Sequence, residues 1–255
     1  MNDGLHIFDE GTGPAVVLLH GLPSPPSDLE NLTSELPGMR VIVPHLPGYG
    51  ASVPRPGRQG VRAIDELLVD ALRERQVENP VVVGYSMGGY RAISLAPRVG
   101  ARAVLVLAGF ADLSPVERTG MTEFASMLRK GQDLRAVLPD RFRAKEWRVR
   151  APADDALVES WLDVARSSTL VEELEDLASA PSLLDALGDL QCPVVARTGE
   201  LDVAVPPIHA RAIAGAAREG TLELVSGVAH AVLLEDRAGT LEAIRRVCAL
   251  APPPR

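Results

Sequence analysis

Short apolar runs alternate with amphipathic segments over residues 1–110 and again from residue 189 onward. The runs are rich in valine, leucine and isoleucine without polar interruption, as expected of strands buried on both faces of a parallel sheet. In residues 64–72 the apolar positions recur instead at i, i+3, i+4, i+7 and i+8, which predicts a helix lying on a sheet face. The predicted strands are residues 5–8 (a short edge strand), 15–19, 41–43, 80–83, 103–107, 193–196 and 221–225. Further helices are predicted over residues 28–36, 90–96, 207–217 and 235–247.

This alternation of strand and helix predicts an α/β fold with a mostly parallel, doubly wound sheet and right-handed crossovers. The pattern changes in residues 111–188, where helical segments dominate and no strand-like run occurs. Breaks in these helices are expected at Gly120, Gly131, Pro139, Pro152 and Pro181. We therefore expect a core domain of residues 1–110 and 189–255, with residues 111–188 inserted as a helical cap, or lid, over the site.

Composition fits one large α/β domain, since 255 residues with 46% hydrophobic content can bury a substantial core. The net charge of −8, with both signs dispersed, argues against a nucleic-acid or anionic-membrane surface. No apolar run approaches the length of a membrane span. Residues 1–6 lack a basic leader and an apolar h-region, so we expect a cytoplasmic protein without a secretory signal.

The two cysteines, Cys192 and Cys248, lie in apolar neighbourhoods without metal-ligand spacing. Buried, reduced thiols are the expected state, consistent with a cytoplasmic protein. No cluster of histidine and carboxylate residues suggests a metal, and no cofactor is expected. His6 and His209 have no suitable partner nearby in the sequence and are interpreted as surface or packing residues. A monomer or homodimer is expected.

Candidate chemistry begins at Ser86, in the pattern Gly-x-Ser-x-Gly of residues 84–88. A predicted strand precedes this pattern and a predicted helix follows it, which is the context of a nucleophile elbow. A serine hydroxyl becomes a good nucleophile only through its geometry and a nearby base. Gly84 and Gly88, which lack a Cβ, let strand and helix approach closely around a strained turn. The pattern therefore predicts that Ser86 is a nucleophile.

Other polar side chains follow other predicted strands. His20 comes after the strand of residues 15–19, Asp202 after that of residues 193–196, and His230 after that of residues 221–225. Ligands of open parallel sheets bind beyond the carboxyl ends of the strands, so Ser86, Asp202 and His230 are expected to meet at one edge. Glu200 and Asp112 are the alternatives to Asp202 as the acidic member.

The chain resembles the α/β-hydrolase family over nearly its whole length, in a serine esterase or lactonase-like branch with a helical cap. Residues 20–23, 46–52, 84–89, 199–202 and 227–230 carry the resemblance. It implies the α/β-hydrolase fold, with Ser86 attacking a carbonyl, His230 transferring the proton and Asp202 orienting the imidazole. It also implies an oxyanion hole formed by the backbone N–H groups of Leu22 and Met87.

These residues are compatible with three functions. The first is hydrolysis of a carboxylic ester or lactone of a small molecule. The second is carbon–carbon bond hydrolysis or pyruvate elimination, as in the menaquinone-pathway synthase, which tends to carry arginine where this chain has Tyr90. The third is ligand binding without catalysis. A serine nucleophile disfavours haloalkane dehalogenases and epoxide hydrolases, which need a carboxylate there.

Substrate contacts are predicted for His20, Tyr85, Trp147 and Trp161. The cap also carries a basic cluster around Phe142, which is either a solvated face or the source of an arginine that pairs with a substrate carboxylate. The cluster consists of Arg141, Arg143, Lys145, Arg148 and Arg150. Many relatives have aspartate in place of His45, and we hypothesise that this imidazole lies near the mouth of the site.

Overall fold

The computed structural model describes residues 4–22, 24–55, 57, 59–135, 137–146, 155–165 and 168–251. Seven strands of this described chain form a single sheet in the order β1-β3-β2-β4-β5-β6-β7. Only β1 runs antiparallel to its neighbour, β3, and all other adjacent pairs are parallel. The strands are β1 (Ile7–Glu10), β2 (Ala15–Leu19), β3 (Arg40–Pro44), β4 (Val81–Tyr85), β5 (Ala103–Leu107), β6 (Val194–Gly199) and β7 (Gly220–Val225). The mostly parallel α/β sheet and the edge position of the first strand confirm the sequence prediction.

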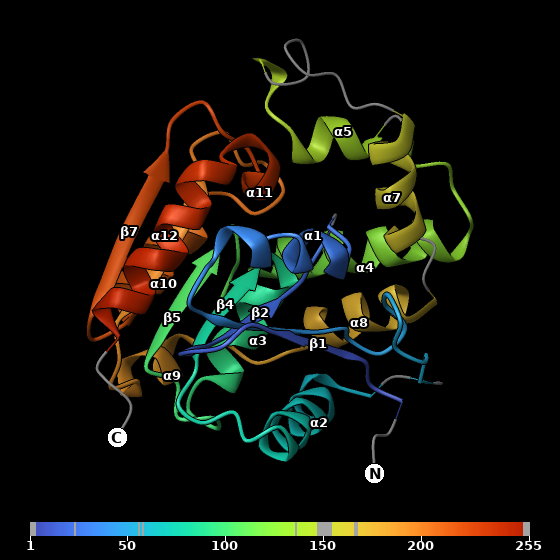
Figure 1. The fold of residues 1–255 in the computed structure, drawn as a ribbon. Coiled ribbons are helices and arrows are strands. Elements are labelled where there is room, and N and C mark those ends of the chain that lie inside the picture. Colours follow the sequence, from blue (N-terminus) through green and yellow to red (C-terminus); the bar gives the residue numbers. More distant parts are fainter. Residues whose placement is uncertain are drawn as a thin grey trace.

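Helices cover both faces of this sheet, because successive strand residues point to opposite faces and both sets are apolar. Val17 and Leu19 of β2 belong to one buried cluster, and Val16 and Leu18 belong to the other. The first cluster packs under α2 (Val61–Glu74), α3 (Met87–Leu95) and α10 (Ile208–Ala216). The second packs under α1 (Pro26–Glu30) and α12 (Arg237–Leu250). The sheet is therefore doubly wound (Figure 1).

Between β5 and β6 the described chain is helical, and we call residues 111–188 the insertion. Figure 1 shows α5 and α7 at the end of the sheet toward which β5 and β7 point. The described helices of the insertion are α4 (Pro115–Arg129), α5 (Val137–Phe142), α7 (Asp155–Ala165) and α8 (Ser168–Ala178). The next helix, α9 (Leu184–Asp189), spans the C-terminal boundary of the insertion. The last of these packs against α10 and α3 of the core.

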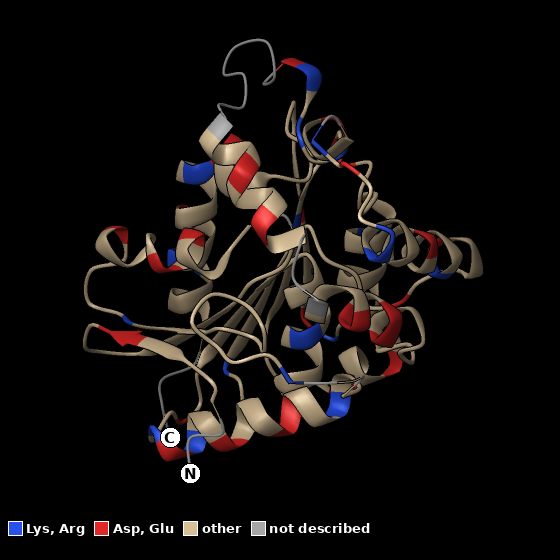
Figure 2. Ribbon diagram, turned by 90° about the vertical axis from the view of Figure 1, so that its right-hand side faces the viewer, with Lys and Arg blue, Asp and Glu red and all other residues tan. Residues whose placement is uncertain are grey.

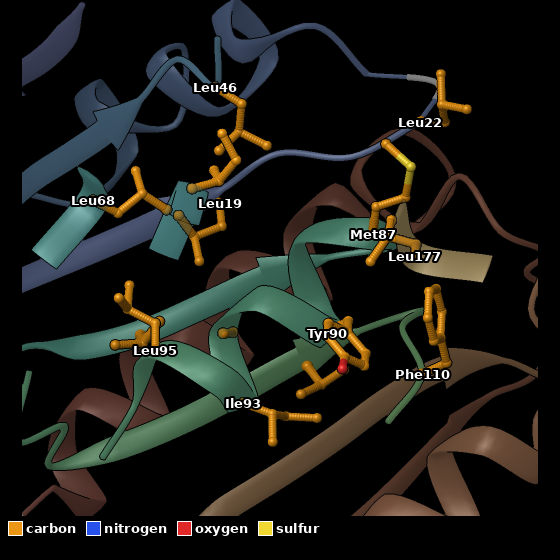
Figure 3. Close-up of a cluster of buried hydrophobic side chains, with 14 of the residues drawn as sticks. Leu19, Leu22, Leu46, Leu68, Met87, Tyr90, Ile93, Leu95, Phe110 and Leu177 are labelled. Atoms are coloured by element: carbon orange, nitrogen blue, oxygen red, sulfur yellow. The ribbon is translucent and has the colours of Figure 1, made fainter. Parts of the chain in front are cut away.

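One buried cluster joins the sheet, the helix after Ser86 and the insertion. Figure 3 shows Leu19 of β2, Met87 of α3 and Leu177 of α8 within it. Burying side chains of this size contributes roughly 1.5–3 kcal/mol each, so the insertion is fixed to the core partly by this apolar contact.

A buried ionic cluster also holds the insertion to the core. Arg91 of α3 pairs with Asp65 of α2 at 3.2 Å and with Glu173 of α8 at 3.0 Å, and all three side chains are at most 5% exposed. The Tyr49 hydroxyl donates to the second oxygen of Glu173 at 2.7 Å, and Ser94 donates to Asp65 at 2.5 Å. The guanidinium thus compensates two buried carboxylates on different elements.

Two predicted helices differ from those observed. The predicted helix 28–36 is shorter and begins at Pro26, whose fixed φ suits the first helical position, and a separate 3₁₀ turn covers Thr33–Glu35. The predicted helix 235–247 corresponds to α12, which begins two residues later, and a short helix that was not predicted, α11 (Val232–Glu235), precedes it. Asp236 interrupts them with φ −141° and ψ 54°, and its carboxylate pairs with Arg197 of β6.

Charged residues of both signs are interspersed along the outer helices, while the central strands carry almost none (Figure 2). Within the described residues, no helix combines the length and the apolar character needed to cross a bilayer.

Candidate active site

Ser86 lies on a strained turn between β4 and α3. Its φ of 55° and ψ of −118° are costly for a residue with a side chain. The turn can be this tight because a Cβ at Gly84 would lie 2.1 Å from the carbonyl oxygen of Gly88, and one at Gly88 would lie 2.2 Å from that of Leu19. The packing therefore requires both glycines, and it presents the Ser86 side chain beyond the carboxyl end of the strand.

An imidazole and a carboxylate complete a hydrogen-bonded chain with this serine. The Ser86 hydroxyl donates to Nε2 of His230 at 3.0 Å, and Nδ1 of His230 donates to Oδ2 of Asp202 at 2.8 Å. These three residues are 4%, 1% and 3% exposed, so water screens their interactions little. In such an arrangement the imidazole can take the proton of the serine hydroxyl, and the carboxylate can stabilise the imidazolium that forms.

Asp202 is held by the loop after β6. Its Oδ1 accepts the backbone N–H groups of Ala204 and Val205, both at 2.9 Å, which leaves Oδ2 facing the imidazole. The alternative acids lie elsewhere, because Glu200 is exposed and Asp112 pairs with Arg118 at 3.0 Å. Of the three candidates, the fold therefore brings Asp202 to His230.

The residues expected to bind an oxyanion lie beside Ser86. Met87 is the first residue of α3, so its N–H has no partner within the helix. Gly21 packs so closely that a Cβ there would lie 2.8 Å from the Met87 nitrogen. This close approach brings the following residue, Leu22, to the same cavity wall, and its carbonyl oxygen lies 3.3 Å from Nε2 of His230.

The histidine loop is joined to the insertion by a group of contacts that we call the Glu235 clamp. Glu235 is buried, and its two oxygens accept the backbone N–H groups of Ala229 at 2.7 Å and Ala144 at 2.8 Å. The Ala231 N–H donates to the Phe142 carbonyl at 2.8 Å, and the Phe142 ring lies 5.2 Å from the His230 ring. The insertion thus contacts the histidine loop directly through Phe142 and indirectly through the Glu235 carboxylate, which joins Ala144 to Ala229.

We expect Glu235→Gln to loosen this clamp, since an amide has one acceptor oxygen for two backbone donors. Leaving one buried N–H unpaired should lower the free energy of unfolding by about 1–3 kcal/mol. Denaturant unfolding measures this loss, and hydrogen exchange should accelerate in peptides spanning residues 142–146 and 227–235. The matched control is Glu242→Gln, at an exposed position of α12. Unchanged exchange in both peptides would show that the carboxylate does not hold them together.

The serine and histidine open into a cavity of about 380 Å³ between the core and the insertion. Its wall is mostly apolar and rich in methionine and phenylalanine. The apolar lining includes Met87, Met121, Met127, Phe110, Phe124 and Phe142. The polar lining besides Ser86 and His230 comprises Glu117, Glu123, Arg141 and His209. The cavity can therefore hold a small apolar group against the serine.

Three of the residues predicted to contact substrate lie behind this wall instead, and Trp147 lies outside the described residues. The buried Tyr85 donates to the His230 carbonyl at 3.2 Å, and burial raises the pKa of its phenol, which keeps it a donor. His20 accepts the Leu46 N–H on Nε2 at 3.0 Å, and burial lowers the pKa of its imidazole to about 3. Trp161 packs edge-on against Phe142. None of these three side chains lines the cavity.

The basic residues predicted around Phe142 also differ in whether they line the cavity. Arg141 lines the cavity, whereas the buried Arg143 guanidinium lies 3.9 Å from the Glu235 carboxylate. Lys145 is exposed, and Arg148 and Arg150 lie outside the described residues. His209, interpreted from the sequence as a surface or packing residue, lines the cavity and bonds to Glu117, which is 92 positions away in the chain.

Within the described residues, the one group of ligand-type side chains close enough to consider for a metal is His6, Glu30 and His45. The Ala51 N–H donates to Nδ1 of His45 at 3.0 Å, so the neutral ring carries its proton on Nε2, which contacts Glu30 at 2.5 Å. Metal ligation through Nε2 would need that proton removed, and metal-bound histidines normally donate from their other nitrogen. The group therefore does not fit a metal. His45 does not line the cavity, and its contacts tie the loop after β3 to α1.

A doubly wound sheet with a serine elbow at one strand end and an acid and a histidine at two others defines the α/β hydrolases. The model of the alpha/beta hydrolase family matches residues 16–243, and the chain belongs to this family.

Among solved structures, the chain is similar to a thermophilic esterase from Thermogutta terrifontis, with a TM-score of 0.83, 25% identity, and coverage of 96% of this chain and 93% of that one. A pimeloyl-[acyl-carrier protein] methyl ester esterase from Aromatoleum aromaticum is 40% identical over 36% of each chain. A 2-succinyl-6-hydroxy-2,4-cyclohexadiene-1-carboxylate synthase from Klebsiella pneumoniae is 29% identical over 41% of this chain and 42% of its own. The matches thus span less than half the length of these two relatives.

Proposed function

We propose that the chain is a serine hydrolase that cleaves a carboxylic ester or lactone of a small molecule through an acyl-enzyme on Ser86. The observation that carries this proposal is the chain of hydrogen bonds from Ser86 through His230 to Asp202, at the wall of a largely apolar cavity. The esterase similarity supports it as well.

In the first step, Oγ of Ser86 attacks the substrate carbonyl carbon while Nε2 of His230 takes the hydroxyl proton. Asp202 keeps the ring proton on Nδ1, so that Nε2 is free to act as the base, and it stabilises the imidazolium. The carbonyl oxygen becomes an oxyanion, for which we assign the N–H groups of Met87 and Leu22 as donors. Removal of one such donor in a characterised hydrolase costs about 2.7–4 kcal/mol of the barrier.

In the second step, the bond to the leaving oxygen breaks, and His230 returns its proton to that oxygen. Water then enters, loses a proton to His230 and attacks the acyl carbon, which releases the acid and restores the Ser86 hydroxyl. The cavity walls exclude bulk water from these charges, where fixed dipoles act more strongly than in solvent. We assign the insertion as the cap that provides those walls through α4 and α5.

A second candidate is the pyruvate-eliminating reaction of the synthase to which the chain is similar. Arg91, the arginine nearest the serine elbow along the chain, is fully engaged between Asp65 and Glu173 and does not line the cavity. Tyr90 donates to the Pro181 carbonyl at 2.7 Å and does not line it either. These contacts favour ester or lactone hydrolysis over that elimination.

The proposal is tested with a fluorophosphonate probe, which reacts with activated serines irrespective of substrate. We expect one adduct per chain by intact mass in the wild type and in Ser182→Ala, an exposed position, and none in Ser86→Ala. Hydrolysis of p-nitrophenyl esters of graded chain length should be lost with the same variant. A wild-type chain that gains no adduct, or an adduct that survives Ser86→Ala, would contradict the assignment of Ser86 as the nucleophile.

A further inference from the structure

A second polar pair lies in the cavity that holds Ser86 and His230. His209 of α10 and Glu117 of α4 both line it, and Nε2 of His209 lies 2.6 Å from Oε1 of Glu117. The pair joins the core to the insertion across the cavity wall, and the His209 side chain is only 11% exposed. The mechanism above uses neither residue.

Glu117 is fixed as a charged acceptor by the start of its own helix. Its Oε2 accepts the Ser114 N–H at 2.7 Å, and the Ser114 hydroxyl accepts the Glu117 N–H at 3.3 Å, a reciprocal capping box. Although burial raises the pKa of this carboxyl group, the hydrogen bonds from Ser114 and His209 bring it below its ordinary value. Both carboxylate oxygens are therefore occupied as acceptors.

This arrangement determines what His209 offers to the cavity. Because a carboxylate can only accept, Nε2 of His209 must be the donor, and Nδ1 of the neutral ring is left with a lone pair. Among the described residues Nδ1 has no hydrogen-bond partner. The cavity lining near this pair in the chain is mostly apolar, from Phe110, Leu113 and Met121, with Glu123 as a further polar residue. Among the described residues, Nδ1 is thus an acceptor without a partner in a mostly apolar wall.

We propose that His209 and Glu117 form a subsite for a hydroxyl group carried on an otherwise apolar acyl or alcohol chain of the substrate. The inference rests on the proposed function, since it names the substrate class of that same site. A hydroxyl donates to Nδ1, whereas a substrate with only apolar atoms there leaves the acceptor unpaired and desolvated.

The test uses two series of small esters, with a hydroxyl moved along the acyl chain in one and along the alcohol chain in the other. Each ester is compared with its deoxy analogue by titration of the released acid. At the best position we expect kcat/KM to be about tenfold higher for the hydroxy ester. In His209→Phe the hydroxy and deoxy esters of each pair should have similar kcat/KM, because a phenyl ring offers the hydroxyl no acceptor. The control His6→Phe, at an exposed histidine outside the cavity, should keep the preference.

Glu117→Gln should change which substrate the subsite prefers, rather than only abolish its preference for a hydroxyl. Its amide oxygen must accept the Ser114 N–H, so its NH₂ group faces Nε2 of His209 and moves the ring proton to Nδ1. The preference should then pass from hydroxy esters to analogues with an ether or ketone oxygen at the same position. The matched control Glu66→Gln, on the exposed face of α2, should behave as wild type.

The inference is overturned if no hydroxy ester in either series is preferred, or if His209→Phe slows hydroxy and deoxy esters equally. Equal slowing would mean that the pair only joins α4 to α10. Fluorophosphonate labelling of the same preparations separates these failures from failure of the proposed function. Labelling that persists without a hydroxyl preference overturns the subsite alone, whereas absent labelling overturns the nucleophile and the subsite together.

Discussion

Asp202→Asn should lower kcat for ester hydrolysis by about four orders of magnitude with little change in KM, as the equivalent change does in another serine hydrolase. The structure gives the reason. Oδ1 of Asp202 accepts two backbone N–H groups, so the asparagine oxygen must occupy that position and its NH₂ group must face Nδ1 of His230. The imidazole then carries its proton on Nε2, the atom that has to accept the proton of Ser86.

Kinetics with the best p-nitrophenyl ester measure this effect, and the rate of fluorophosphonate labelling should fall with kcat. Asp185→Asn, at an exposed position of α9, is the control for a carboxylate-to-amide change. The unfolding midpoint should stay near that of the wild type, because the asparagine keeps both backbone bonds. A kcat for Asp202→Asn within tenfold of wild type would remove this residue from the proton transfer.

Arg91→Met should cause the largest loss of stability, about 3–5 kcal/mol of unfolding free energy, or roughly 10 °C in Tm. The methionine fills most of the volume but leaves Asp65 and Glu173 buried without a cation. Because Glu173 lies on α8, the loss should also weaken the attachment of the insertion. Arg62→Met, which removes an exposed i,i+4 pair, should cost at most a few tenths of a kcal/mol.

The stability defect of Arg91→Met should also depend on pH. Burial already raises the pKa of Asp65, and loss of the guanidinium raises it further. A carboxyl group whose pKa is raised by folding destabilises the fold where it is ionised, above that pKa. The cost disappears as falling pH protonates it in the folded state. Denaturant unfolding should therefore show the difference from wild type shrinking from neutral pH toward about pH 4. A defect that does not change over this range would argue against unpaired carboxylates as its cause.

The pattern of apolar residues identified the sheet well, because strands buried on both faces must be apolar along their whole length. Helix ends were predicted less well. At Asp236, between α11 and α12, the carboxylate pairs with Arg197 of β6, 39 positions away. No local pattern around residue 236 indicates that partner.

The substrate contacts show the same limit. Tyr85 ends β4 and His20 directly follows β2, and for this reason both were predicted to contact substrate. Their side chains are instead buried and bond to the backbone of other segments. Which way a side chain points at the end of a strand depends on what packs around it. His209 is a packing residue as predicted, but no local pattern indicates its pairing, because its partner Glu117 lies on the insertion, 92 positions away.

By itself the sequence determined the alternation of strand and helix, the position of the serine elbow, and the order in which serine, acid and histidine follow three strands. These features are local, because each depends on burial periodicity or on a glycine-dependent turn within a few residues. Only the tertiary structure decided that Glu235 clamps the histidine loop, that Arg91 is enclosed by two carboxylates, and that His209 faces the cavity beside Glu117. Those contacts join the core to the insertion or link residues on separate elements, so they exist only once the elements have packed together.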